Sequence, residues 1–256
     1  MKRWFSLLVT LLVLSVIIHA DEKFYKKENP FITDVDSLAL MPTENNIWQS
    51  LEEQYNLPTG WFFGLKRLES DGVYKKTNYQ SLSEPGFVDS IAAVTDSMIR
   101  YCFNEANKSY ILPDGEIRSL CKRILVNLNA ADERNPFTTL NHNFPKGKFI
   151  HLLLDSLGAD AVLVPSYQLA SAEISRSIAK WDGYSERYST SAGYEVEGKT
   201  YAFSMVSTMI GRDGDTLWVG RYGMRVLNAR TNGENIFEKD RIEEAVRKSF
   251  KKVLKK

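Results

Sequence analysis

The sequence has little of what marks the specialised classes of protein. After residue 20, no stretch approaches the ~18 consecutive apolar residues that crossing a bilayer takes. Two cysteines, 15 glycines and 8 prolines in 256 residues are too few for a disulfide scaffold, a collagen or a low-complexity chain. Neither charge sign is in excess, since 33 basic and 32 acidic residues give +1, so no general field attracts nucleic acid. What remains is an ordinary globular composition, 43% hydrophobic and 12% aromatic.

The N-terminus has the layout of a secretory signal peptide. Met1-Lys2-Arg3 precedes an apolar stretch over residues 4–18, and Ala20 stands before an acidic residue. We predict that residues 1–20 are removed after Ala20 and that the protein is periplasmic. Ile18, three residues before the cut, is branched rather than small, so an uncleaved segment anchored in the inner membrane is the alternative. No cysteine follows the apolar run, so a lipid cannot be attached there.

The two cysteines, Cys102 and Cys121, both lie in the part predicted to be exported. An oxidising compartment permits a disulfide between them. Each also falls on the apolar stripe of a predicted helix, where cysteine behaves as a small hydrophobic residue. The sequence leaves both interpretations open and favours the second.

Composition divides the exported part into a leader and one domain. Residues 21–35 are charged and aromatic without a clean period, and we expect them to be exposed. Residues 36–256 then form a single domain that carries an insertion at about 43–86, where glycine and proline break the pattern into short pieces. Trp48, Trp61 and Phe62 lie in this insertion and are candidates for a partner-binding surface, although interior packing is the commoner fate of such residues.

The hydrophobic periodicity predicts an α/β fold, a mixed β-sheet covered by amphipathic helices, with a C-terminal β-hairpin and helix. Asp213-Gly214 between two alternating runs predicts the hairpin, and Gly158 predicts the end of a helix just before a buried strand. We expect the helices to cover one side of the sheet and to begin near 88, 115, 147 and 238. The predicted strands lie near 37–42, 109–112, 161–168, 200–210 and 216–227.

Metal and nucleotide sites find no support in the sequence, and we predict no cofactor. Beyond the leader there are only two histidines, His142 and His151, with Asp155 one helical turn after the second. Zinc normally takes three or four ligands, and no cluster of that size is present. No glycine-rich turn joins a strand to a helix in the manner of a phosphate-binding loop.

A hydrolase remains the alternative among enzymes. Ser166 follows a predicted buried strand, but it lacks the Gly-x-Ser-x-Gly elbow and the sequence places no histidine beside it. A carboxylate-based site is the other form of this alternative, and adjacent acidic residues are usually a solvated face. The acidic pairs are Glu52-Glu53, Asp132-Glu133 and Glu243-Glu244.

The last ten residues are basic. They contain six cations and no acid, among them Lys251, Lys252, Lys255 and Lys256. Cations at a helix C-terminus complement the helix dipole and stay hydrated. The alternative is contact with anionic lipid or an acidic partner.

Several passages together resemble the TolB N-terminal/CsgG-like group of bacterial periplasmic envelope proteins. They are residues 38–42 (Leu-Ala-Leu-Met-Pro), residues 157–165 (Leu-Gly-Ala-Asp-Ala-Val-Leu-Val-Pro), Trp181, and a hairpin ending at 227–234. The similarity extends from about 36 to 254. The chain departs from the group in lacking a lipidated cysteine and in its insertion of some forty residues.

The resemblance implies a mixed sheet backed by helices and an assembly or accessory role without enzyme activity. It assigns no functional residue to this chain. With no catalytic motif in the sequence, we expect a non-enzymatic, secreted accessory or structural protein. Its expected partners are other envelope proteins, bound in an oligomeric assembly. The alternatives are the hydrolase above and a carrier of a small ligand, which would need a closed apolar cavity.

Overall fold

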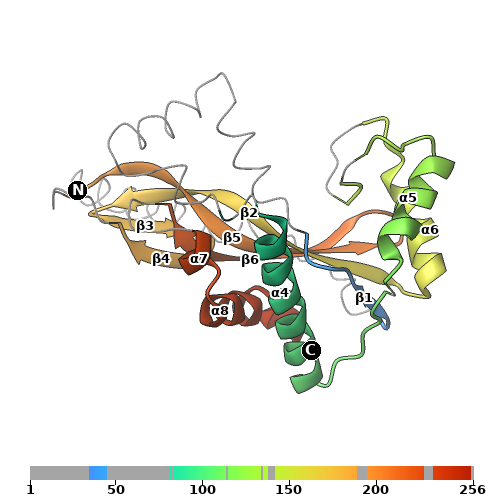
Figure 1. Ribbon diagram of the computed structural model, residues 1–256, viewed down its shortest axis with the longest axis horizontal. Helices are drawn as coiled ribbons and strands as arrows, with labels where there is room; N and C mark the ends of the chain where they lie inside the picture. The colour runs from blue at the N-terminus through green and yellow to red at the C-terminus, as the bar shows by residue number, and fades with distance from the viewer. Residues whose placement is uncertain are drawn as a thin grey trace, which may run out of the picture.

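The computed structural model describes residues 35–44, 81, 84–113, 115–133, 135–137, 142–188, 195–227 and 233–254. The predicted signal peptide, the leader up to residue 34 and nearly all of the predicted insertion lie outside these residues. Within them the fold is α/β, as predicted: a mixed sheet with helices packed on it (Figure 1). None of the described helices combines the length and apolar character needed to cross a bilayer.

The described sheet has six strands in the order β4-β3-β2-β5-β6, and β1 pairs with the start of β2. The β1–β2 pair is parallel, whereas the other pairs are antiparallel. The strands are β1 (Leu38–Leu40), β2 (Ala161–Ser175), β3 (Ile178–Trp181), β4 (Tyr184–Arg187), β5 (Gly198–Gly211) and β6 (Thr216–Val226). The hairpin predicted at Asp213-Gly214 joins β5 to β6, with Gly214 at φ 81°.

Two predicted strands differ from the structure. The segment predicted as a strand at 109–112 makes a single bridge, Ala39 to Ile111, at the outer edge of β1. The stretch after Ser166 continues as one long strand and then turns back as the hairpin β3–β4. The second hairpin turn is Asp182-Gly183, both with positive φ, which is the same dipeptide signal that predicted the β5–β6 turn.

The helices cover both faces of the sheet, which corrects the expectation of cover on one side. Along β2, Ala161 and Leu163 belong to the core shared with α4 and α8, whereas Val162 and Val164 belong to the core shared with α5 and α6. All four are at most 2% exposed. An uninterrupted apolar strand is typical of a strand buried on both faces, so the run itself indicated two layers.

The helix positions follow the predicted periodicity. Helix α6 ends where expected, at Gly158, whose φ of 66° is a left-handed conformation that glycine adopts without strain. The inward residues of α8 are buried, among them Ile242, Ala245 and Val246. The described helices are α4 (Pro85–Glu105), α5 (Ile117–Asn127), α6 (Lys146–Leu157), α7 (Gly233–Ile236), α8 (Lys239–Ser249) and α9 (Lys251–Leu254).

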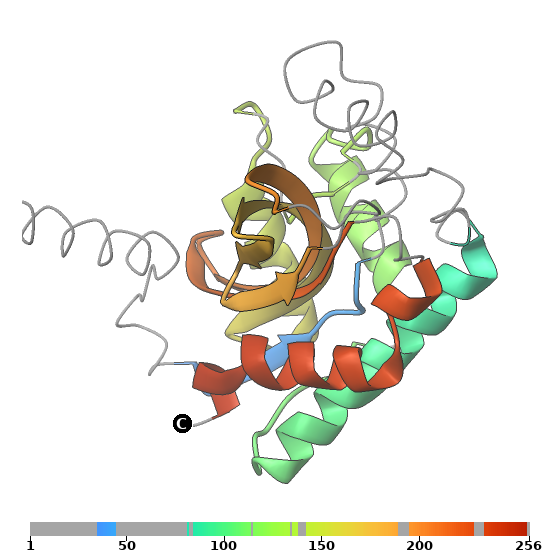
Figure 2. The ribbon, with the colours of Figure 1, turned by 90° about the vertical axis from the view of Figure 1, so that its left-hand side faces the viewer.

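At the end of the sheet remote from β1, the strands curl until β4 meets β6 (Figure 2). The backbone N–H of Gly223 donates to the carbonyl of Asp182 (3.2 Å), and that of Val226 donates to Glu186 Oε2 (3.0 Å). The contact is so close that a Cβ at Gly223 would lie 2.4 Å from Trp181 Nε1. Glycine at this position therefore lets the sheet close on itself.

Candidate functional site

The candidate nucleophile, Ser166, is a structural residue of the sheet. It is buried in β2, its hydroxyl donates to the carbonyl of Val206 (3.3 Å), and Gln168 Nε2 donates to it (3.3 Å). His142 lies exposed in a turn, and His151 lies on the exposed side of α6. The structure thus brings neither histidine into the buried environment of Ser166.

Three of the other candidate polar residues, His151, Glu243 and Glu244, pair with neighbours at the surface. His151 Nε2 lies 3.3 Å from Asp155, which confirms that the two share one helix face. Glu243 pairs with Arg247 (3.0 Å), and Glu244 accepts a hydrogen bond from the Tyr222 hydroxyl (2.8 Å). Asp132-Glu133 lies in a turn, and Glu52-Glu53 lies outside the described residues. No group of three potential metal ligands occurs in the described part of the chain.

The two cysteines are free thiols on opposite faces of the sheet. Cys102 is part of the core under α4 and α8, whereas Cys121 packs against the core under α5 and α6. A disulfide between them would have to pass through the sheet, so the structure supports their role as small hydrophobic residues. Burial raises the pKa of Cys102, and it raises that of Cys121 to about 11, so both stay protonated at neutral pH.

The candidate binding residues in the insertion, Trp48, Trp61 and Phe62, lie outside the described residues. Of the basic C-terminal residues, Lys251 and Lys252 belong to α9, and Lys251 is exposed. Lys255 and Lys256 also lie outside the described part. Contact with partners or lipid at these positions therefore stays a prediction.

An apolar groove runs between α4 and α8, and we call it the α4–α8 groove. Its volume is about 660 Å³. Figure 2 shows the two helices lying against each other where the groove forms. Tyr101 is 54% exposed and Val94 is 37% exposed, although the other face of α4 is buried against the sheet. The lining residues are Ala93, Val94, Ser97, Met98 and Tyr101 of α4, and Lys239 and Glu243 of α8.

Ion pairs at one end of the groove hold the Tyr101 ring in place. The guanidinium of Arg247 lies over the ring, 5.6 Å from its centroid. Arg247 donates in turn to Glu105 Oε2 on α4 (2.8 Å) and to Glu243 Oε1 on α8 (3.0 Å). The hydrogen bond with Glu105, followed by that with Glu243, raises the pKa of Arg247, so this cation is permanent. Arg247 thereby links the two helices and the aromatic ring through partly exposed contacts.

Sequence reasoning did not identify this groove. Met98 is half-buried and packs against the core under α4 and α8, and it also lines the groove. Val94, Met98 and Tyr101 also stand at i, i+4 and i+7, so a second apolar stripe was visible in the spacing. Its exposure depends on where α8 lies, and the helix periodicity carries no information about that.

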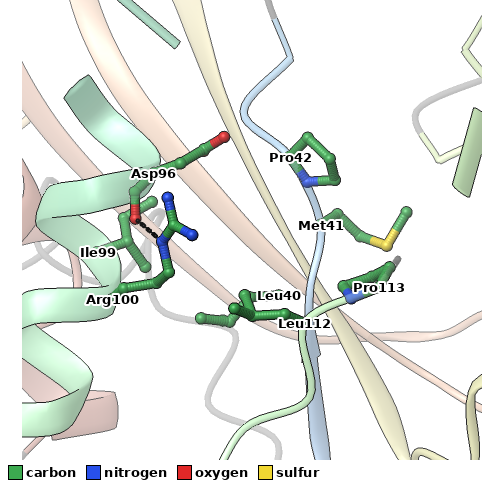
Figure 3. A pocket seen from close by; sticks show the side chains of 8 residues that line it. All are labelled: Leu40, Met41, Pro42, Asp96, Ile99, Arg100, Leu112 and Pro113. Atoms are coloured by element: carbon green, nitrogen blue, oxygen red, sulfur yellow. Dashed lines mark hydrogen bonds between the residues drawn. The ribbon is translucent and has the colours of Figure 1, made fainter. Parts of the chain in front are cut away.

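A smaller pocket lies on the other flank of α4, and we call it the Arg100 pocket (Figure 3). Its volume is about 170 Å³, and its apolar walls come from β1, α4 and the segment 112–113. Asp96 Oδ1 accepts hydrogen bonds from the backbone N–H (2.9 Å) and the hydroxyl (2.5 Å) of Thr43. The lining residues are Leu40, Met41, Pro42, Asp96, Ile99, Arg100, Leu112 and Pro113.

A polar contact to the other helical layer comes from the residue that follows Thr43. Glu44 Oε2 accepts a hydrogen bond from Asn135 Nδ2 (2.5 Å). Burial raises the pKa of Glu44, and the hydrogen bond from Asn135 offsets part of that rise. Thr43 and Glu44 thus tie the end of the β1 segment to α4 on one side and to the segment around Asn135 on the other.

No family model, curated protein or solved structure matches this chain. The resemblance to the TolB N-terminal/CsgG-like group therefore stays a prediction. Arguments about function rest on the geometry of the described residues.

Proposed function

We propose that the chain is an exported accessory protein of the bacterial cell envelope that acts by binding another protein in the α4–α8 groove. The observation that carries this proposal is the groove itself, in which exposed apolar side chains line a hollow of about 660 Å³. Single exposed apolar residues are ordinary on protein surfaces, whereas a grouped set in a concavity marks an interaction site.

Tyr101 has the properties of a residue that dominates a binding interface. Such residues are enriched in tyrosine, tryptophan and arginine, and binding removes them from water. Because the fixed Arg247 lies over its ring, Tyr101 has less conformational freedom to lose when a partner covers it. Val94 and Met98 lie on the same stripe of α4 and extend the apolar contact.

The charges around the groove define the chemistry of the partner. Glu243 is neutralised by Arg247, whereas Lys239 makes no ion pair with any described carboxylate. Its neighbour Glu238 pairs with Arg241 instead (3.7 Å). The groove therefore presents apolar surface beside one unneutralised cation. We infer a partner segment that carries apolar side chains followed by a carboxylate directed at Lys239.

The test places a photo-crosslinking amino acid at Val94 of the full-length protein in its native envelope. We expect one dominant crosslinked partner, and we expect its yield to fall at least about tenfold when Tyr101→Ala or Lys239→Glu is added. The matched control is Val126→Ala on α5. Val126 is 53% exposed, almost the same exposed fraction as that of Tyr101, but it lies away from the groove. That variant should leave the yield unchanged.

Exchanging the two charges tests whether Lys239 contacts an acidic residue of the captured partner. Changing the facing acidic residue of the captured partner to lysine should restore its binding to Lys239→Glu. A yield that neither Tyr101→Ala nor Lys239→Glu changes would show that the groove is not the binding surface.

Export has its own test, independent of the groove. We expect the protein from a periplasmic extract to have the intact mass of a chain that begins at Asp21. Recovery of the full-length chain from the cytosol would contradict the proposed location.

The candidate surface at Trp48, Trp61 and Phe62 can be tested by alanine replacement in the crosslinking assay described for the groove.

A further inference from the structure

The Arg100 pocket offers a guanidinium group whose terminal nitrogens have no hydrogen-bond partner among the residues that the structure describes. Arg100 Nε donates to the backbone carbonyl of Asp96 one turn earlier (3.2 Å), which fixes the side chain. Arg100 is one of the lining residues of the pocket, and Figure 3 shows its guanidinium beside the Asp96 side chain, with the hydrogen bond to the Asp96 carbonyl made by Nε and not by the terminal nitrogens. The terminal nitrogens of Arg100 form no ion pair with any described residue. By contrast, Arg212, Arg225, Arg241 and Arg247 each pair with a carboxylate.

The carboxylate of Asp96 does not neutralise Arg100, although the two residues are one helical turn apart. Thr43 donates two hydrogen bonds to Asp96 Oδ1 and holds the side chain toward the β1 segment. In Figure 3 the Asp96 side chain extends toward Pro42, away from the guanidinium. The pocket therefore has its cation at one place and its anion, already hydrogen-bonded, at another.

The remaining walls are apolar and the space is small. Six of the eight lining residues are Leu, Ile, Met or Pro, and Leu112 at the edge of the pocket is 49% exposed. The volume of the pocket is about 170 Å³. Typical sites for drug-sized ligands start near 300 Å³, so this pocket admits a short chain only.

We propose that the Arg100 pocket binds a carboxylate that carries a short aliphatic chain. The carboxylate accepts two hydrogen bonds from the planar guanidinium, the geometry for which arginine is suited. The chain lies against Leu40, Ile99 and Leu112, whose burial supplies the apolar part of the binding free energy. Two sources share this chemistry: a free branched aliphatic acid and the C-terminal residue of a polypeptide.

The proposal goes beyond the partner-binding groove and does not depend on it. Asp96 and Arg100 lie on one flank of the buried face of α4, and Val94, Met98 and Tyr101 lie on the other. Changes at Arg100 thus leave the groove intact, and failure of one proposal does not imply failure of the other.

The test is an NMR titration of the full-length protein with 4-methylpentanoate, observed at the methyl groups of Met41, Ile99 and Leu112. We expect saturable shifts at these methyls, and at least tenfold weaker binding of the uncharged 4-methylpentanamide, since the amide has no negative charge. Arg100→Gln should weaken binding of the acid at least tenfold, and Arg100→Lys should weaken it less. The matched control is Arg118→Gln, an exposed arginine on α5, which should bind as the unmodified protein does.

Peptide probes distinguish the two sources. If acetyl-Gly-Leu with a free C-terminus binds more tightly than 4-methylpentanoate, the natural ligand is a polypeptide end, and the reverse order indicates a free acid. Equal binding of acid and amide, or of free and amidated peptide, would overturn the proposal without any variant. Shifts that persist in a folded Arg100→Gln protein would also overturn it.

Discussion

The two helical layers of this molecule meet the same sheet and differ in their outer faces. Helix α6 buries Phe149, Ile150, Leu153 and Leu154 completely, and its outer side carries polar residues. Helix α4 buries one apolar stripe in the same manner and exposes a second one around Tyr101. The burial against the sheet explains why both layers fold. The second stripe of α4, around Val94 and Tyr101, contributes less to the described core, and it is the surface on which the proposed binding function rests.

The sharpest way to break this comparison is to truncate one aromatic residue in each layer. Phe149 is fully buried. The centroid of its ring lies 5.8 Å from that of Phe137 and 6.0 Å from that of Phe144. Phe149→Ala should lower the free energy of unfolding by about 3–5 kcal/mol, because it leaves a cavity. Tyr101→Ala should lower it by less than about 1 kcal/mol, the range of an exposed cation–π contact.

Urea denaturation of both variants measures these two effects. If Tyr101→Ala cost as much as Phe149→Ala, Tyr101 would be a core residue and the groove would lose its functional interpretation.

The second prediction concerns how α8 is seated on the sheet. A Cβ at Gly220 of β6 would lie 2.2 Å from the carbonyl oxygen of Ser249 and 2.3 Å from the Trp218 ring. Gly220→Ala should therefore push the end of α8 away and cost about 1–3 kcal/mol. It should also weaken crosslinking from the groove, since α8 forms one wall.

The matched control is Gly86→Ala in the first turn of α4, where a Cβ would meet nothing within 4 Å. Alanine is the better helix former, so this variant should gain up to about 1 kcal/mol in thermal or urea unfolding. A Gly220→Ala protein as stable as the unmodified one would show that α8 is not held against β6 as described.

The third prediction uses the pH dependence of stability to test the burial of Glu44, whose carboxylate accepts a hydrogen bond from Asn135. Burial raises the pKa of Glu44 in the folded protein, so the folded state binds the proton more tightly than the unfolded state. The stability that this tighter proton binding contributes is complete below the pKa of Glu44 in the unfolded state. It is lost as the pH rises through the pKa of Glu44 in the folded state.

Glu44→Gln removes this dependence and should be more stable than the unmodified protein at pH 7, with the difference shrinking toward pH 4. Urea midpoints at pH 4, 5, 6 and 7 give the comparison, with the exposed Glu84→Gln as control. A constant difference across this range would mean that Glu44 titrates alike in both states.

The smallest effect is expected at the cysteines, one in each layer. Because both thiols are free, adding a reductant should leave the unfolding midpoint unchanged, whereas loss of a disulfide typically costs about 2–4 kcal/mol. A thiol reagent should react slowly with the native protein and should label two thiols in urea without reductant. A midpoint that falls on reduction would instead support the alternative interpretation, a Cys102–Cys121 disulfide.

Much of the fold follows from local patterns in the sequence. The sequence predicts the glycine that ends α6, the buried strand that follows it and the Asp-Gly turn of β5–β6, because neighbouring residues determine each of them. The β2–β3 turn was not predicted, because Arg176 and Ser177 both adopt positive φ, which neither residue type favours. The strand expected at 109–112 was overestimated, since only Ile111 finds a partner in β1.

The candidate site was the less predictable part, and the reason is also physical. A groove between two helices exists only once both have been placed on the sheet, and the periodicity of α4 cannot show which stripe α8 leaves open. The same holds for Arg100. Its guanidinium can bind a ligand only because Thr43 donates two hydrogen bonds to Asp96 and holds that carboxylate toward the β1 segment. Ser166 stood out in the sequence by its position after a strand, yet the long β2 strand buries it.

The curled end of the sheet has a consequence for solubility. Exposed strand edges present unpaired backbone groups that recruit edges of other molecules and lead to aggregation. Where β4 meets β6, the N–H groups of Gly223 and Val226 already have acceptors within the same chain. This stretch of β6 therefore offers fewer unpaired N–H groups to the strand edge of a second molecule, which makes the curled end a poor template for edge-to-edge pairing.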